Sequence, residues 1–318
     1  MRESGKGWFV SSLANVLTER RKAVAAVVVS VLLWSSAFVA IRSAAEHYHP
    51  GALALGRLLA GAVVLVLVLL VRREGWPPRR AWPGIVVFGV LNFAGYMVAL
   101  HWGEQQVDAG TAAMIVAVGP IVTALLSGWL LGEGFPPRLL AGLLVSFLGA
   151  VVVGSSMSGN GAASILGALL CLVAAISAAC GVVAQKPALQ YASALQVTTL
   201  ACLVGALACL PFSGELISDV GSAPWPATAN MVYLGVFPTA IAFTTWAYAL
   251  SRTTAGKAGV TLYAVPAVTV SMSWIMLGEL PSFTAFLGGA LCLAGVAVSR
   301  WKPRTMSRRR PPVLARAD

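Results

Sequence analysis

The sequence predicts an all-α polytopic membrane protein with ten transmembrane helices, arranged as two five-helix inverted repeats. Three observations predict it: the composition, an internal repeat at a fixed offset, and the distribution of basic residues. Of the 318 residues, 58% are hydrophobic and only 10% are charged, whereas a soluble domain carries about 25% charged residues. So few charges cannot cover a soluble surface, and apolar runs of about 20 residues are typical of membrane-spanning helices rather than barrel strands.

The second observation is a stretch that occurs twice without a gap. Residues 109–133 read AGTAAMIVAVGPIVTALLSGWLLGE, and residues 255–279 read AGKAGVTLYAVPAVTVSMSWIMLGE. Their separation is 146 residues throughout (266 − 120). Fixed-offset similarity over a whole helix and its neighbours indicates a duplicated unit. The matched pairs include Pro120/Pro266, Thr123/Thr269, Ser127/Ser273, Glu133/Glu279 and, further away, Gly89/Gly235 and Gly149/Gly295.

Turn signals rich in proline and glycine divide the apolar runs. We predict a cytoplasmic tail at 1–22, a first five-helix repeat at 23–156, a second at 157–300 and a basic cytoplasmic tail at 301–318. The predicted spans are 23–42, 51–71, 84–101, 109–131, 138–156, 164–184, 195–213, 230–251, 256–278 and 282–300.

The third observation is the placement of basic residues, which predicts the topology. If the amino terminus is cytoplasmic and the spans alternate, only Arg42 and Arg57 fall in the outer half. The outer segments instead carry Glu46, Glu104, Asp108, Glu215 and Asp219. This is the positive-inside pattern, and ten spans with both termini inside satisfy it. The inner segments hold Arg2, Lys6, Arg20, Arg21, Lys22, Arg72, Arg73, Arg79, Arg80, Arg138, Lys186, Arg252, Lys257 and the basic tail.

The duplication and the topology together predict a transport mechanism. A unit of five spans is odd-numbered, so the second unit enters the membrane in the opposite orientation. Inverted repeats of this kind build outward-open and inward-open states around a site at the midplane. The residues therefore favour an alternating-access transporter.

Catalytic and metal-binding motifs are missing from the sequence. It contains no HExxH, Walker loop or paired midplane carboxylates, so we predict no enzyme and no cofactor or metal. The five cysteines read as small apolar fillers, and the spacing of His47, His49 and His101 suggests solvated loop residues. Glu104 and Asp108 could carry protons near the outer face, but capping of the fourth span is the favoured interpretation.

Two kinds of residue are candidates for gating. Arg57 lies inside the second span, where it orients an anionic group or locks the outer gate, or alternatively snorkels outward or pairs with Glu46. Arg42, at a span end, is interpreted as an interface anchor. Pro120 and Pro266 interrupt helices in the membrane and are candidate hinges.

Aromatic, hydroxyl and amide side chains in the spans are candidates for a solute cavity. Such a set suits a small amphipathic solute, although aromatic stripes also occur in cores and interfacial belts. The Thr and Ser that follow each proline either line this cavity or join helices. The cavity candidates are Trp34, Ser36, Asn92, Tyr96, Thr239, Trp246 and Tyr263.

An ordered set of marks resembles the drug/metabolite transporter superfamily, in its members with two EamA-type domains. The marks are residues 34–42 (WSSAFVAIR), Gly56-Arg57-Leu58-Leu59, the two proline-to-Leu-Gly-Glu segments, and residues 234–246. Ser35 and Ala37 depart from the family's usual Gly and Asn. The resemblance implies ten helices, a central cavity lined by helices one, three, four, six, eight and nine, and export of amino acids, nucleosides or toxic compounds from the bacterial cytoplasm.

The predicted function is a secondary exporter of a small-molecule solute in the bacterial inner or plasma membrane. The alternatives are an intramembrane enzyme acting on a lipid-like substrate and a passive channel. The basic tail is expected to contact anionic lipid rather than nucleic acid. Proton coupling and assembly as a homodimer remain open.

Overall fold

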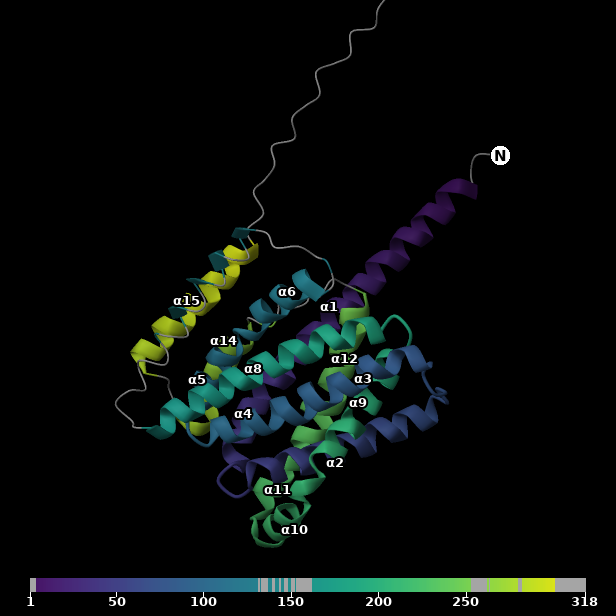
Figure 1. The fold of residues 1–318 in the computed structure, drawn as a ribbon. Coiled ribbons are helices and arrows are strands. Elements are labelled where there is room, and N and C mark those ends of the chain that lie inside the picture. Colours follow the sequence, from purple (N-terminus) through teal and green to yellow (C-terminus); the bar gives the residue numbers. More distant parts are fainter. Residues whose placement is uncertain are drawn as a thin grey trace, which may run out of the picture.

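A computed structural model describes residues 4–130, 162–252, 264–279 and 282–300, together with the isolated positions 132, 137–138, 141–142, 144–145, 148–149, 152 and 262. The described residues form helices and contain no strand. The helices lie side by side in one bundle, with α1 projecting from it at its amino-terminal end (Figure 1). The prediction of an all-helical protein is confirmed for this part of the chain.

The first half of the chain contains four long apolar segments, and the second and fourth have clear start signals. His49 and Pro50 begin the second segment, where proline suits the first helical turn. Asp108 caps the fourth by accepting a hydrogen bond from the Thr111 amide. The elements are α1 (Ser4–Ala44), α2 (Pro50–Val71), η1 (Arg79–Ala81), α3 (Trp82–Phe88), η2 (Gly89–Gly95), α4 (Tyr96–Glu104), α5 (Ala109–Val116) and α6 (Gly119–Leu130).

The second half follows the same plan. Ser193 begins α9 with a capping box that includes Gln196. The elements are α8 (Ala162–Ala188), α9 (Ala194–Ala208), η3 (Leu210–Phe212), α10 (Ser213–Ser222), α11 (Trp225–Leu234), η4 (Gly235–Ile241), α12 (Ala242–Ser251), α14 (Ala264–Leu277) and α15 (Phe283–Arg300).

Six helical segments are long and apolar enough to cross a membrane, and the bent pair α9–α10 would add a seventh. Two shorter apolar helices lie at 264–277 and 286–295, while most of the predicted span 138–156 lies outside the described residues. The six segments are Arg21–Ala44, Pro50–Val71, Arg79–Glu104, Ala109–Leu130, Ile165–Ala188 and Trp225–Ser251. The protein is therefore a multi-pass membrane protein.

One predicted boundary was wrong. The seventh span was expected to continue to residue 213, but α9 ends at Ala208 and the chain bends by 56° into η3 and α10. Pro211 lacks the amide hydrogen that a continuing helix would use, which accounts for the break. At the amino terminus, the helix begins at Ser4, and its part that is apolar enough to cross a membrane begins at Arg21, close to the predicted start of the first span.

The 146-residue offset extends to the backbone conformation. The described chain has π-helical turns at Gly89–Gly95 and at Gly235–Ile241, positions that the offset makes equivalent. Gly132 and Gly278 are equivalent as well, and both have φ of +69°, a conformation that glycine adopts readily. The same irregularities therefore recur in both halves.

The two halves are packed together by reciprocal contacts. A Cβ atom added to Gly235 of η4 would lie 2.5 Å from the carbonyl oxygen of Arg57 in α2. A Cβ atom added to Gly89 of η2 would lie 2.7 Å from the carbonyl oxygen of Ala201 in α9. Since α2 and α9 both precede their own half's π-helical segment, each half inserts its second helix against the third segment of the other.

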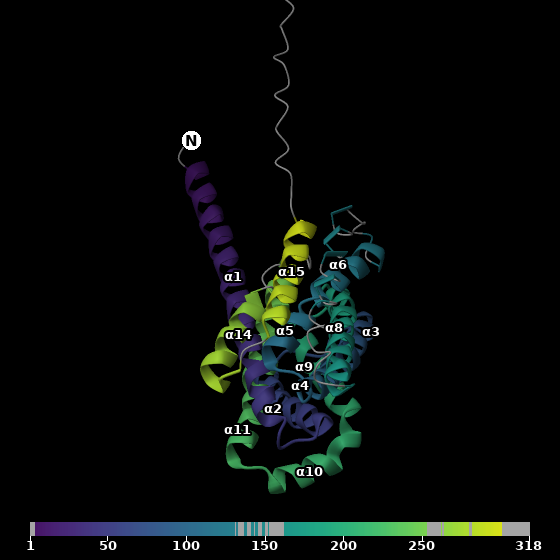
Figure 2. The same cartoon turned by 90° about the vertical axis from the view of Figure 1, so that its left-hand side faces the viewer.

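The bundle has two distinct ends. Segments 45–49, 105–108 and 209–224 meet at one end, which α10 covers, and we call it the α10 end (Figures 1 and 2). The amino-terminal part of α1 projects from the opposite end.

Candidate functional site

A cavity lies in the middle of the bundle and is lined by six of the helical segments. The lining residues come from α1, the α3–η2–α4 segment, α5–α6, α8, α12 and α14. Protein atoms leave about 1020 Å³ of space there, open solvent included. The helices are those that the family resemblance implied.

One wall of the cavity is aromatic. Trp34 of α1 lies with its ring centre 5.1 Å from that of Phe243 and 5.4 Å from that of Trp246, both of α12. The indole Nε1 of Trp34 donates a 3.1 Å hydrogen bond to the carbonyl oxygen of Pro238 in η4. This hydrogen bond fixes the Trp34 ring, which lines the cavity, against the π-helical segment of the other half.

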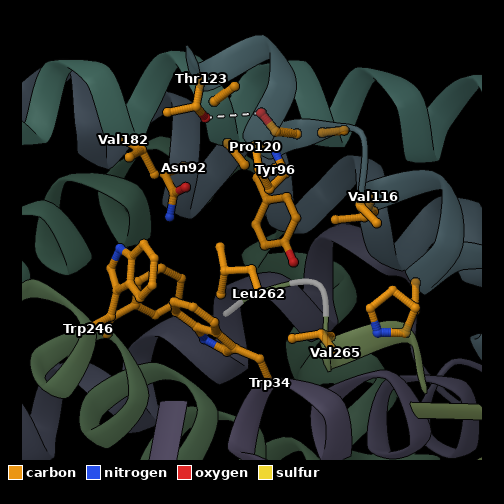
Figure 3. Close-up of a pocket in the computed structure, with 18 of the residues that line it drawn as sticks. Trp34, Asn92, Tyr96, Val116, Pro120, Thr123, Val182, Trp246, Leu262 and Val265 are labelled. Atoms are coloured by element: carbon orange, nitrogen blue, oxygen red, sulfur yellow. Dashed lines mark hydrogen bonds between the residues drawn. The ribbon is translucent and has the colours of Figure 1, made fainter. Parts of the chain in front are cut away.

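The opposite wall presents the polar groups. Asn92 of η2 is 3% exposed, and its Nδ2 atom has no hydrogen-bond partner among the described residues. Figure 3 shows the Asn92 amide and the Tyr96 hydroxyl extending into the space in front of Trp34 and Trp246. A buried amide donor without a partner costs roughly 1–3 kcal/mol, so a ligand acceptor at this position would be stabilised.

The cavity lining is almost free of charge. Its described members are apolar or aromatic apart from Asn92, Tyr96 and Thr123, and they include no Asp, Glu, Lys, Arg or His. Such a surface favours a solute with a sizeable apolar part and disfavours one with a strong net charge.

The predicted hinge prolines both line the cavity. Pro120 is the second residue of α6 and follows an interruption between α5 and α6 at Ala117 and Val118. Thr123, on the same face, donates to the Gly119 carbonyl (Figure 3). Pro266 lies near the start of α14. Hinge motion at either proline remains a prediction.

Of the other predicted cavity residues, Trp34, Asn92, Tyr96 and Trp246 do line the cavity. Ser36 does not, because its hydroxyl bonds the Leu33 carbonyl and the Tyr233 hydroxyl. Tyr263 lies outside the described residues.

Thr239 was also predicted to line the cavity, and the structure places it elsewhere. It is fully buried and accepts a 2.8 Å hydrogen bond from Nε of Arg57. Arg57 in turn is only 2% exposed, so neither snorkelling nor an ion pair with Glu46 describes it. Instead it lies inside the protein, with Nη1 at 3.4 Å from Nε2 of His101.

The prediction of a solvated loop residue was wrong for His101, and so was the capping interpretation of Glu104. Both are fully buried on α4, because the helix continues past the expected end of the third span and turns these side chains inward. Asp108 alone acts as the cap of α5. Neither carboxylate oxygen of Glu104 has a hydrogen-bond partner among the described residues.

Arg42 ties the two halves together at the α10 end. Its Nε donates to Oε1 of Glu279 at 3.0 Å, and its Nη1 donates to the main-chain carbonyl oxygen of Glu104, also at 3.0 Å. One guanidinium thus joins α1, the end of α4 and the segment after α14. The prediction of a simple interface anchor does not describe this role.

Further contacts close the α10 end. The hydroxyls of Tyr48 and Thr228 lie 2.7 Å apart, and the amide of His49 donates to Oδ2 of Asp219 at 2.7 Å. Gln105 donates to the carbonyls of Ala45 and Tyr48. These bonds link the ends of α1, α4, α10 and α11 to one another at the α10 end.

Comparison with known proteins identifies the family. The model of the EamA-like transporter family matches the chain twice, at residues 21–155 and 165–301. The chain belongs to the EamA-like transporter family. This EamA-like chain is 37% identical to a probable terminal-alkyne amino-acid exporter of Streptantibioticus cattleyicolor, over 91% of its own length and 96% of that protein. It is 33% identical to the uncharacterized transporter YdfC of Bacillus subtilis, over 87% and 90% of the two chains.

A solved crystal structure shares the fold of this EamA-like transporter. The TM-score is 0.63 at 24% sequence identity, and the match covers 87% of this chain and 97% of that one. Together with the apolar helices, the family match makes the protein a membrane transporter.

Sequence reasoning missed the small residues that complete the cavity in this EamA-like transporter. Ala175, Ala178 and Ala179 of α8 form part of the lining. Alanine carries no chemical signal, and the only hint was the implied role of helix six. Their small size is what leaves space between α8 and the aromatic wall.

Proposed function

We propose that the protein is a secondary transporter that exports a small amphipathic metabolite by alternating access. The observation that carries the proposal is the central cavity, which lies between two halves with recurring backbone irregularities, while side-chain bonds join these halves at the α10 end. A site enclosed between two related halves, and blocked on one side, is what alternating access requires.

The proposed orientation follows from the charges. With the amino terminus and the basic tail in the cytoplasm, the α10 end faces outward, and the segments 23–156 and 157–300 form two oppositely oriented repeats. The described conformation is then closed to the outside. Pro120 and Pro266, at the cavity, are the proposed hinges about which the closure changes sides.

The proposed solute carries an apolar group and a hydrogen-bond acceptor. Trp34, Phe243 and Trp246 would contact the apolar group, and Nδ2 of Asn92 would donate to the acceptor. One relative is named as a probable exporter of an amino acid with a terminal alkyne, a small molecule with both features. Amino acids with apolar side chains are therefore the first class to test.

The test is solute flux into proteoliposomes of the full chain. A panel of apolar amino acids, nucleosides and cationic dyes is compared for wild type, Asn92→Ala and Trp246→Ala, with Trp129→Ala as control because Trp129 is 70% exposed on α6. The proposal predicts saturable flux that falls at least about tenfold in the cavity variants, the equivalent of 1.4 kcal/mol, and that is unchanged in the control.

Three results would count against this proposal. Flux that does not saturate would favour a channel, and conversion of the solute without movement across the membrane would favour an enzyme. Saturable flux that is equal in all four proteins would keep the transporter but remove the cavity assignment.

A further inference from the structure

A group of ionisable side chains, several of them fully buried, lies between the cavity and the α10 end. Its centre is Glu104, at the end of α4, which is fully buried. Glu104 interacts electrostatically with Arg42 of α1, Arg57 of α2, Tyr96 of α4, Asp108 before α5, Cys171 of α8 and Glu279 after α14. His101 of α4 lies beside Arg57.

The Glu104 carboxyl group is not satisfied by this environment. Both of its oxygens lack a hydrogen-bond partner among the described residues, although Arg42 binds the carbonyl oxygen of the same residue. The Arg42 guanidinium instead pairs with Glu279. A buried carboxylate is strongly destabilised without a proton, a cation or hydrogen-bond donors, so the arrangement calls for one of them.

The repeat shows that three of these positions do not need a charge or a titratable group for packing. At the 146-residue offset, Glu104 corresponds to Leu250 and His101 to Ala247, and both counterparts are buried. In the second helix of each half the packing equivalence has an offset of 144 residues (201 − 57), and Ala201 packs on Gly89 as Arg57 packs on Gly235. Apolar residues therefore suffice for Glu104, His101 and Arg57 in the second half, whereas the Arg42–Glu279 pair has charged counterparts in Lys186 and Glu133.

We propose that Glu104 is a proton-binding site, and that its occupancy decides which carboxylate holds Arg42 and hence whether the α10 end is closed. This proposal rests on the proposed transport function. With the proton bound, Glu104 is neutral and Arg42 remains on Glu279. When the carboxyl O–H bond breaks and the proton passes to water, the Glu104 carboxylate competes for the guanidinium that already contacts its own carbonyl.

Loss of the Arg42–Glu279 pair then releases the segment after α14 from α1. The described conformation is the proton-bound, closed form, in which Arg42 pairs with Glu279. Because a proton gradient across a membrane sets the occupancy of such a site, Glu104 would couple transport to protons.

The test measures the opening of the α10 end directly and uses no solute. Nitroxide spin labels are placed at His47→Cys and Phe283→Cys, both exposed beside the α10 end, in the full chain with its five native cysteines replaced by alanine. The distance distribution is recorded from about pH 5 to about pH 8.5, a range in which buried carboxyls titrate. The compared proteins are the labelled parent, Glu104→Gln and Asp108→Asn.

The proposal predicts that the parent gains a longer-distance population as the pH rises, by about tenfold or more. Glu104→Gln, which cannot ionise, retains the short distance at every pH. Asp108→Asn, the matched neighbouring carboxylate, shifts with pH as the parent does. A parent that does not respond, or a Glu104→Gln protein that responds normally, overturns the proposal.

A separate readout keeps the two proposals distinguishable. If the labelled protein shows the predicted shift but proteoliposomes show no solute movement, the proton site stands and the transport proposal fails. If solute flux is present and the distance is independent of Glu104, only the proton site fails.

Discussion

Removal of the Arg42–Glu279 pair is expected to open the α10 end, by an amount that the geometry bounds. At the 3.0 Å separation of Nε and Oε1, the Coulomb energy is about 5.5 kcal/mol at an effective dielectric constant of 20. Both side chains are 28% exposed, so solvent screening and desolvation reduce the net contribution to about 1 kcal/mol. The second bond of Arg42, to the Glu104 carbonyl, adds about 1.5–3 kcal/mol because its donor is charged.

These two energies predict that Arg42→Ala opens the α10 end more than Glu279→Gln does. Glu279→Gln removes only the ion pair and should raise the open population about fivefold, whereas Arg42→Ala removes both bonds and should raise it about a hundredfold. Spin-label distances between positions 47 and 283 measure both populations. Arg72→Ala, an exposed arginine just beyond α2, serves as the control and should change nothing.

An effect of Glu279→Gln equal to or larger than that of Arg42→Ala would refute the reasoning, since it would mean that the carbonyl bond contributes nothing to closure.

Three further substitutions, two of them with a matched control, test the contacts between helices. Gly235→Ala should destabilise the protein by about 1–3 kcal/mol, because its Cβ would meet backbone atoms of α2, while Gly214→Ala, with nothing within 4 Å, should be neutral in thermal unfolding. Thr239→Val should lower the free energy of unfolding by about 3 kcal/mol, because it leaves the buried guanidinium of Arg57 without its acceptor. The control is Thr199→Val, whose buried hydroxyl has no partner among the described residues. It should be neutral or stabilising in the same assay. Trp34→Phe should lower the free energy of unfolding by about 1–3 kcal/mol and weaken solute binding, since it removes the indole donor to the Pro238 carbonyl of η4.

The helices and the repeat could be predicted from the sequence because apolar runs and matching residues at a fixed offset can both be read along the chain. Apolar runs long enough to span a membrane located six segments, and the fixed offset pointed to equivalences that reappear as paired π-helical turns and paired left-handed glycines. The bend after α9 was missed because an apolar run alone does not reveal that Pro211 ends the helix within it.

The cavity was predicted in part. Trp34, Asn92, Tyr96 and Trp246 were found because aromatic and amide side chains in an apolar span carry a chemical signal. Thr239 carried the same kind of signal, but its partner is Arg57 of the other half, a contact that no local pattern encodes.

The buried charges at the α10 end were misplaced for a related reason. His101 and Glu104 lie near a predicted span end, where either loop or helix was consistent with the sequence. Only the packing of α4 against its neighbours decides that they point inward. Position along a span therefore predicted depth in the membrane but not the face of the helix.

Thiol labelling of a cavity residue tests most directly whether the cavity opens to one side at a time. Val116→Cys, in the cysteine-free chain, places a thiol in the cavity lining, and a membrane-impermeant maleimide is applied to either face of oriented vesicles. We expect labelling from the amino-terminal side in the parent, and a shift of labelling to the α10 side when Arg42→Ala is added. Equal labelling from both sides in both proteins would contradict alternating access.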